Sequence, residues 1–193
     1  MIDEDPYVDA RGVLVNKLGI TSAAALSQAQ ADLSLAAMLR LSVHPLPGAY
    51  DLDHLRGFNR QIFGTVYDWA GRLRTVNIAR NSRDVFCRWP YIESSSAEVF
   101  AGLTDEGLLA GLTRNAFVAR LAHHYGEVNA IHPFREGNGR TQRAFFGQLA
   151  HDAGWRIAWS DMRPSENDDA SAAALQGDPY PLTVMFESIV RPL

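Results

Sequence analysis

The sequence is 193 residues long, 47% hydrophobic and 21% charged, which suits one compact domain with its own core. Its net charge of -4 and its single Lys, Lys17, argue against a general nucleic-acid binder, because binding to a phosphate backbone needs clustered positive charge. The single Cys, Cys87, cannot form an internal disulfide. No stretch reads as a secretion signal, and none has the ~20 consecutive apolar residues that span a bilayer. We therefore expect a cytoplasmic protein that contacts neither membrane nor nucleic acid.

Two helices are expected in the first third of the chain. Residues 22–41 are dense in good helix formers and contain neither Gly nor Pro, so we expect residues 1–50 to form an N-terminal arm and a helix that packs on the core. Across 51–71, apolar residues recur every three or four positions, which predicts a core helix that stops at Gly71. The recurring residues are Leu52, Leu55, Phe58, Ile62, Val66 and Trp69.

The period changes to two at residues 72–93. Alternating side chains, a polar turn and then an aromatic, β-branched run predict a β-hairpin, with Pro90 confining the second strand to a sheet edge. The fold is therefore predicted to be mainly α, interrupted by one hairpin. Further helices are expected at about 94–110, at 113–130, from about 140 to Gly154, and as a last short helix in the tail.

The stretch IHPFREGNGRTQR, residues 131–143, lies between two of these helices. Pro133 fixes where the first helix must end. The triplet Gly137-Asn138-Gly139 then gives a turn into a helix N-terminus, where unpaired N–H groups and the helix dipole favour an anion. Because Arg140 and Arg143 are three apart on one helix, both guanidinium groups can hold the same phosphate.

Two more residues of this stretch add chemistry. Glu136 offers a hard oxygen ligand beside the anion site, which suits Mg²⁺ held by one carboxylate, phosphate oxygens and water. His132 is the group most able to accept a proton near neutral pH. Together these residues predict transfer of a phosphate-containing group onto a hydroxyl. The sequence contains no GxxxxGK[ST] loop and no kinase motif set.

Structural roles are expected for the remaining His, Cys and Trp residues. His123 and His124 are adjacent rather than one helical turn apart, so we expect no metal site there, and none at His151. Cys87 is expected to be a small edge-strand residue rather than a nucleophile. The Trp residues are expected in the core or a groove, with Trp89 also placed to contact a substrate.

The segment HPFREGNGRTQR matches the motif HPFx[D/E]GNGRxxR of Fic proteins at every specified position, and YDWAGRLRTVNI and FCRWPYIE resemble the core helix end and flap that precede it in that family. The resemblance covers about residues 51–190. It implies a Fic-type helical bundle with a β-hairpin flap, in which residues 51–193 form the Fic domain, the flap lies at about 74–92 and the motif at 132–143. Such proteins are mostly protein adenylyltransferases that transfer AMP from ATP to a Ser, Thr or Tyr hydroxyl.

Carried over position by position, the resemblance implies that His132 deprotonates the target hydroxyl, which then attacks the α-phosphorus of ATP. It implies that Glu136 holds Mg²⁺ against the phosphates and that Phe134 anchors the loop in the core. Asn138 would support the α-phosphate within the anion hole, and the arginines would hold the β- and γ-phosphates. The nucleotide-binding residues implied in this way are Gly137, Asn138, Gly139, Arg140 and Arg143.

The resemblance also implies partners. The flap would pair with an extended segment of a target protein by β-augmentation, and type II topoisomerase subunits are targets of similar bacterial toxins. Many Fic proteins are restrained by a helix with the pattern [S/T]xxxE[G/N], whose Glu pairs with the second motif Arg, here Arg143. The helix at 22–41 contains no Glu. A separate small antitoxin that carries this pattern is therefore the expected restraint.

Alternatives remain open at this point. Thr183 to Glu187 has the Thr and the Glu of the inhibitory pattern but lacks its final Gly or Asn, so self-inhibition through Glu187 is the rival to an antitoxin. Relatives with the same fold transfer UMP, phosphocholine or phosphate, so the donor is a second open question. A non-catalytic homologue that only holds a peptide or nucleotide is a third, although the intact motif argues against it.

Overall fold

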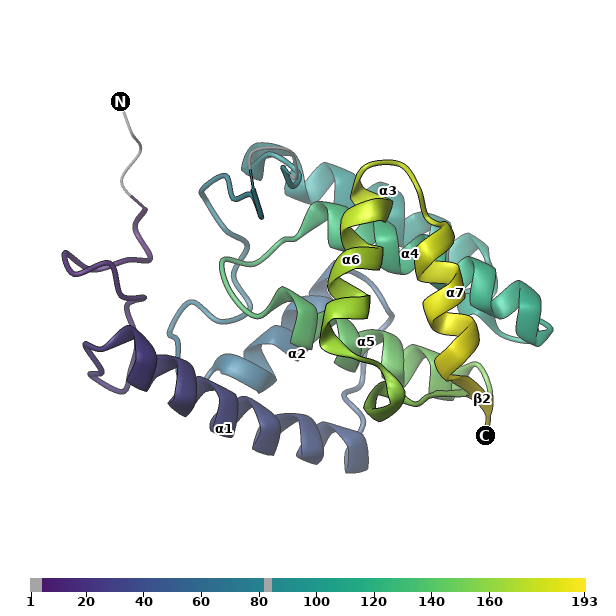
Figure 1. Ribbon diagram of the computed structural model, residues 1–193, viewed down its shortest axis with the longest axis horizontal. Coiled ribbons are helices and arrows are strands. Elements are labelled where there is room, and N and C mark those ends of the chain that lie inside the picture. Colours follow the sequence, from purple (N-terminus) through teal and green to yellow (C-terminus); the bar gives the residue numbers. More distant parts are fainter. Residues whose placement is uncertain (1–4, 82–84) are drawn as a thin grey trace.

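The computed structural model describes residues 5–81 and 85–193, which form a mainly α-helical bundle (Figure 1). Within these residues, seven α-helices and one pair of short antiparallel strands are found. Their bounds are α1 Ala23–Val43, α2 Leu52–Phe63, α3 Ile92–Asp105, α4 Arg114–Ile131, α5 Asn138–Asp152, β1 Trp155–Ile157, α6 Pro164–Leu175, α7 Tyr180–Ile189 and β2 Val190–Pro192.

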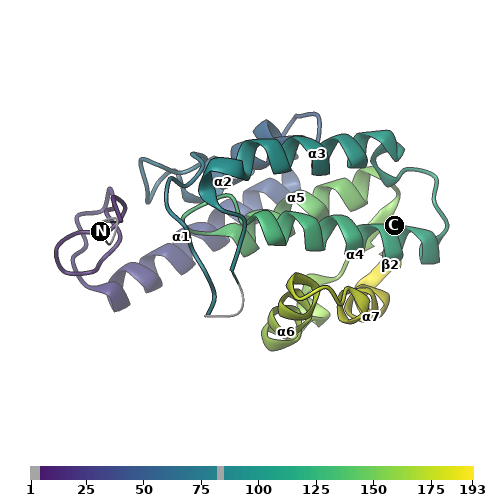
Figure 2. The ribbon, with the colours of Figure 1, turned by 90° about the horizontal axis from the view of Figure 1, so that it is seen from above.

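The centre of the bundle is formed by α4 and α5, the two helices that flank the polar stretch. Helix α4 packs against α3, α6 and α7, whereas α5 packs against α1, α2 and β1. Figure 2 shows α6 and α7 together beyond α4, away from α1. Phe117 of α4 and Phe145 and Phe146 of α5 are completely buried, and each buried aromatic ring removes ~150–250 Å² from water. Both helices that flank the motif therefore pack into one core.

Two helices end earlier than the apolar period predicted. Helix α2 starts with Asp51 as its N-cap, which accepts from the His54 N–H at 2.8 Å, but it ends at Phe63 rather than near Gly71. Beyond it, Val66 and Tyr67 both donate to the Phe63 carbonyl, so the buried apolar residues continue through turns instead of helix. Helix α3 likewise stops at Asp105, because the left-handed residues 107–109 turn the chain away.

Within the described residues, the expected hairpin is present as one isolated antiparallel bridge, between Ala79 and Val85; the expected turn falls on residues 82–84, which lie outside them. Pro90 lies in a 3-10 turn rather than in a strand. The physical reason is that donors in both arms bond elsewhere: Arg74 N–H donates to the Pro133 carbonyl and Cys87 N–H to the Ala130 carbonyl, both at 2.9 Å. This flap segment, residues 74–92, is thus attached to the motif loop.

The C-terminal region contains two features that the sequence reading lacked. The alanine-rich residues after Pro164 form α6, since Pro is favourable in the first helical turn. Strands β1 and β2 pair antiparallel, with Arg156 opposite Arg191, across more than thirty residues of chain. Local patterns cannot reveal such a distant pair. The expected last helix is confirmed as α7.

The N-terminal arm folds back onto the bundle. Tyr7 packs edge-on against Trp69, with ring centroids 5.2 Å apart, and Asp5 forms an ion pair with Arg135 of the motif at 2.8 Å. Helix α1 then packs along α2 and α5. None of the helices among the described residues combines the length and apolar character needed to cross a membrane.

Candidate active site

The motif loop, residues 132–137, joins the C-terminal end of α4 to the N-terminal end of α5. Helix α4 ends at Ile131, and His132 follows with φ 48° in the left-handed conformation, which reverses the chain. Gly137, with φ 81°, precedes α5 and lets the next helix begin with its N–H groups facing the loop. A side chain at Gly137 would also collide with the Phe63 ring, 2.1 Å from an added Cβ. Glycine is therefore required at this position.

The interior of the loop is held by Phe134 and Asn138. Phe134 is buried among the residues of the main hydrophobic core. Asn138 Oδ1 accepts from the Phe134 N–H at 2.9 Å, and its Nδ2 donates to the Phe134 carbonyl at 2.7 Å. The Asn138 side chain thus shapes the loop, while the first N–H groups of α5 are the donors available to an anion.

His132 is held in a mostly apolar setting. Its ring stacks on Phe86 of the flap segment, with centroids 3.8 Å apart and planes at 17°. Its Nδ1 lies 3.2 Å from the Asn129 carbonyl. Because a carbonyl only accepts, Nδ1 carries the hydrogen and Nε2 is left to take a proton. Burial lowers the pKa of His132 to about 4, opposed by the Asn129 carbonyl and assisted by Arg74 and Arg80, so the imidazole is neutral at pH 7.

Glu136 and Arg140 are joined in a network that reaches α1. Glu136 Oε1 accepts from the Gly137 N–H at 2.8 Å, from Gln30 Nε2 at 3.2 Å and from Arg140 Nη2 at 3.3 Å. Arg140 Nη1 donates to Ser34 Oγ at 2.8 Å. One carboxylate oxygen is thus engaged, and a single carboxylate at a phosphate-sized space fits Mg²⁺, which keeps water and phosphate oxygens as its other ligands. Among the described residues no cluster of three or more His, Cys, Asp or Glu could hold a metal by itself.

A cavity of about 260 Å³ opens between these groups. Arg143 borders it, with Nη1 3.4 Å from the position of a Cβ on Gly139, and Arg140 lies over the Phe63 ring at 4.7 Å. Three arginines and one carboxylate give the cavity a net positive charge. The residues that line it are Ile78, His132, Arg135, Glu136, Gly137, Asn138, Gly139, Arg140 and Arg143.

Sequence reasoning missed four residues of this site. Arg135 occupies the variable position of the motif, and Ile78 comes from the flap segment. Gln30 and Ser34 are buried on α1, four residues apart, and this spacing of polar side chains on one helix face is a signal that the sequence did contain. For Arg135 and Ile78, the sequence contains no comparable spacing that would indicate a place at the cavity.

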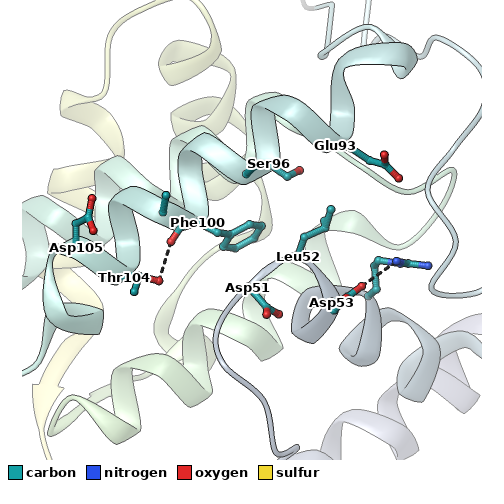
Figure 3. Close-up of a pocket in the computed structure, with 11 residues that line it drawn as sticks. Asp51, Leu52, Asp53, Glu93, Ser96, Phe100, Thr104 and Asp105 are labelled. Carbon is teal, nitrogen blue, oxygen red and sulfur yellow. Dashed lines mark hydrogen bonds and ion pairs between the residues drawn. The ribbon is translucent and has the colours of Figure 1, made fainter.

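A larger cavity, about 580 Å³, lies between α2 and α3 and is a poorer candidate (Figure 3). Its carboxylates include Asp51, which caps α2, and Asp53, which pairs with Arg56 at 2.8 Å. Acidic residues at helix starts are explained by the helix dipole. No His lines this cavity, and its one arginine is already paired.

Glu187 and His124 lie away from the site. Glu187 is exposed, and its carbonyl accepts from Arg114 at the start of α4. Arg143 lies near Tyr125, and roughly 16 Å of helix separates Arg114 from Tyr125. His124 Nε2 lies 3.2 Å from the carboxylate of Glu106, the residue that follows α3.

Three comparisons with known proteins agree with this geometry. The model of the Fic/DOC family matches residues 49–150. "Probable protein adenylyltransferase Fic" of Escherichia coli K12 is 36% identical over 187 residues, 96% of this chain and 92% of the relative. "Protein adenylyltransferase VbhT" of Bartonella schoenbuchensis is 38% identical over 90% of this chain, which spans only 36% of that relative.

Solved structures show the same arrangement of helices. The N-terminal Fic domain of a putative cell filamentation protein from Bartonella quintana, with bound ADP, has a TM-score of 0.88 and 28% identity, covering 96% of this chain and 94% of that one. BepC from Bartonella tribocorum, with bound AMPPNP, has a TM-score of 0.92 over 97% of both chains. At 24% identity, the second comparison shows the fold alone.

Proposed function

This chain belongs to the Fic/DOC family, and we propose that it is a protein adenylyltransferase that transfers AMP from ATP to a hydroxyl side chain of another protein. The observation that carries the proposal is a neutral histidine at the edge of a cavity whose other walls are a helix N-terminus and arginines. A base beside an anion site is what nucleotidyl transfer to a hydroxyl requires.

The reaction follows from these positions. His132 Nε2 takes the proton of the target hydroxyl, whose oxygen forms a bond to the α-phosphorus of ATP. The bond from the α-phosphorus to the bridging oxygen breaks, and pyrophosphate leaves with both electrons. Arg140 and Arg143 hold the β- and γ-phosphates, and the N–H groups at the start of α5 stabilise charge on the α-phosphate.

Mg²⁺ would bind Glu136, which lines the cavity. When bound, the ion neutralises phosphate charge. Replacing Glu136 by Ala is expected to raise the Mg²⁺ concentration needed for half-maximal transfer. Added EDTA is expected to stop transfer by the wild-type chain. Unchanged rates in both experiments would reject the metal.

The donor is tested by the position of the label. The chain is incubated with a lysate and ATP carrying label at either the α- or the γ-phosphate. AMP transfer labels a protein from α-labelled ATP only, whereas phosphate transfer labels it from γ-labelled ATP only. Parallel reactions with UTP and CDP-choline test the other donors. No labelled protein in any arm would reject the proposed function.

We propose that the target docks on the flap segment, which contributes Ile78 to the cavity and stacks Phe86 on His132. Arg80 donates to the Asp168 carbonyl of α6 at 2.6 Å, so the flap segment is also held from that side. A type II topoisomerase subunit in the cytoplasm is the target we propose to test first. Mass spectrometry of the labelled band in the lysate identifies the modified protein and residue.

Regulation in trans is proposed from an apolar groove that ends at Arg143. The groove, about 310 Å³, is lined by Met38 and Leu41 of α1, by α5, and by residues near the C-terminus. Beside it, α1 exposes Leu35, Leu39 and Val43 at helical spacing. A helix with an apolar face and one Glu would fit both the groove and the arginine.

The partner to test is a short protein with the pattern [S/T]xxxE[G/N] encoded next to this chain. We expect it to co-purify with the chain and stop labelling, and Leu39→Asp to abolish both effects. Inhibition that survives Leu39→Asp would place the partner elsewhere.

A further inference from the structure

Arg74 is completely buried where the flap segment begins. Its Nε donates to the His132 carbonyl at 2.8 Å, and Nη1 donates to the Val76 carbonyl at 2.7 Å. Nη2 donates to the carbonyls of Ile131, at 3.1 Å, and of Cys87. One guanidinium thus joins both arms of the flap segment to the end of α4. The rigid fork of five donors makes this possible, and a Lys ammonium cannot reproduce it.

Phe86 contacts the side chain of His132, whereas Arg74 binds its backbone carbonyl. His132 is left-handed, which costs roughly 1–2 kcal/mol for a residue other than glycine, so its neighbours must hold it there. The Phe86 ring covers the imidazole at 3.8 Å, and the Asn129 carbonyl fixes Nδ1. Backbone, ring plane and tautomer of His132 are therefore each set by a separate contact.

We propose that Arg74 and Phe86 are positioning residues for His132: Arg74 fastens the flap segment to the backbone of the base, and Phe86 fixes the plane of its ring. A hydroxyl presented on the flap segment then meets Nε2 at a set distance. Neither residue is among those that line the cavity, and neither belongs to the motif. The inference rests on the proposed transferase function.

The charged groups that act on the imidazole come from the flap segment, as Arg74 and Arg80. Helix α4 contributes the Asn129 carbonyl, which favours the protonated ring, and Phe86 contributes an apolar face. Removing the Phe86 ring would admit water to the imidazole. The protonated form would then become easier to reach, and a larger fraction of the base would be lost in mild acid.

Phe86→Leu tests the ring contact with the whole chain. We expect kcat to fall roughly tenfold or more with KM for ATP unchanged, because the phosphate-binding groups remain in place. The acid limb of the pH profile of kcat, where the rate falls as His132 is protonated, should move from about pH 4 toward 6.5. Phe86→Tyr, which keeps the ring, should restore both. Phe100→Leu, the matched control in the core, should lose stability without changing kcat or the limb.

An NMR titration of the His132 C2–H signal, assigned with His132→Ala, gives a readout that needs no activity. If Phe86→Leu changes neither the limb nor the His132 titration, the role of Phe86 is rejected. If the wild-type chain transfers no nucleotide, the proposed function fails, and the titration still decides this inference.

Arg74→Lys tests the clamp, by which we mean the four hydrogen bonds from the Arg74 guanidinium to backbone carbonyls. The variant keeps the positive charge and loses the planar guanidinium. We expect kcat to fall while the acid limb stays in place, and Arg114→Lys, whose guanidinium also bonds to carbonyls, should leave kcat unchanged. Wild-type kcat in Arg74→Lys would reject the clamp. If that variant does not fold, hydrogen exchange of backbone amides in the wild type decides the question. Fast exchange of the Cys87 N–H, which donates to the Ala130 carbonyl, would mean that the flap segment is not held against α4 and would reject the clamp.

Discussion

Two histidines, His124 within α4 and His132 directly after it, occupy different electrostatic surroundings. His124 is buried beside Glu106, which in turn pairs with Arg120, and the carboxylate opposes the lowering of the His124 pKa by burial. His132, at the end of the same helix, has Phe86 on one face and two arginines nearby, so cations add to the effect of burial. Burial lowers the pKa of both imidazoles, and of the two it is His132 that lines the 260 Å³ cavity.

The contrast shows that a lowered pKa does not by itself identify a catalytic base. His124 has its Nε2 against a carboxylate and no space in front of it, which suits a structural role. His132 combines neutrality with an Nε2 that is not committed and with an anion site alongside. Geometry separates the two residues where titration does not.

Replacing each histidine by Gln gives the largest expected difference. His132→Gln should lower the rate of AMP transfer ~10²–10⁴-fold, since a positioned base contributes about that much. His124→Gln should leave the rate intact and lower the free energy of unfolding by ~1–3 kcal/mol, because a buried ring is replaced by an amide of different shape, while Arg120 keeps Glu106 paired. Labelling assays and urea titrations of both variants measure this. Equal loss of activity in the two variants would contradict the distinction.

Gly137→Ala tests the loop that faces His132. The positive φ and the 2.1 Å approach to Phe63 should destabilise the chain by more than ~2 kcal/mol and weaken ATP binding, because α5 must shift. Gly154→Ala is the matched control, since φ is 91° there and no atom lies near the added Cβ. Calorimetry of ATP binding and thermal unfolding compare them. Similar ATP affinity in both variants would show that the tight turn is dispensable.

The pH dependence should separate activity from stability. Transfer should be constant near neutrality and fall as His132 is protonated, near pH 4. Because the folded pKa lies below 6.5, the unfolded chain binds more protons, so stability is fully present above pH 6.5 and is lost as pH falls toward 4. His124 acts in the same direction.

Urea unfolding at pH 7 and pH 5 checks the stability part. The loss of stability between these values should be smaller in His132→Gln and in His124→Gln than in the wild type. The pH limb of transfer should be the same in His124→Gln and the wild type. A limb that moved in His124→Gln would mean that the two sites are coupled.

The smallest effect is expected at the far end of α4. Glu187→Ala should change neither transfer nor self-modification, because Glu187 is exposed near Arg114 and not near Arg143. Autolabelling with α-labelled ATP measures this. A sharp rise in self-modification would instead support inhibition through Glu187 and would remove the need for a partner in trans.

The motif and most helices could be predicted from the sequence because their signals are local. Apolar period and Gly or Pro punctuation located α1, α4, α5 and α7, and the spacing from His132 to Arg143 indicated the chemistry. The end of α2 was predicted wrongly, and Pro90, expected in an edge strand, lies in a 3-10 turn instead. In both places backbone donors bond to a distant or unexpected acceptor, and no period of side chains records that choice.

The sequence by itself determined which groups could act: one base, one carboxylate, two arginines and a glycine turn within thirteen residues. Only the tertiary structure decided how they are held. Gln30 and Ser34 reach the motif from α1, and Arg74 and Phe86 reach His132 from the flap segment. These contacts join residues from about 45 to more than 100 positions apart. They depend on how the helices pack, and packing is a property of the whole core.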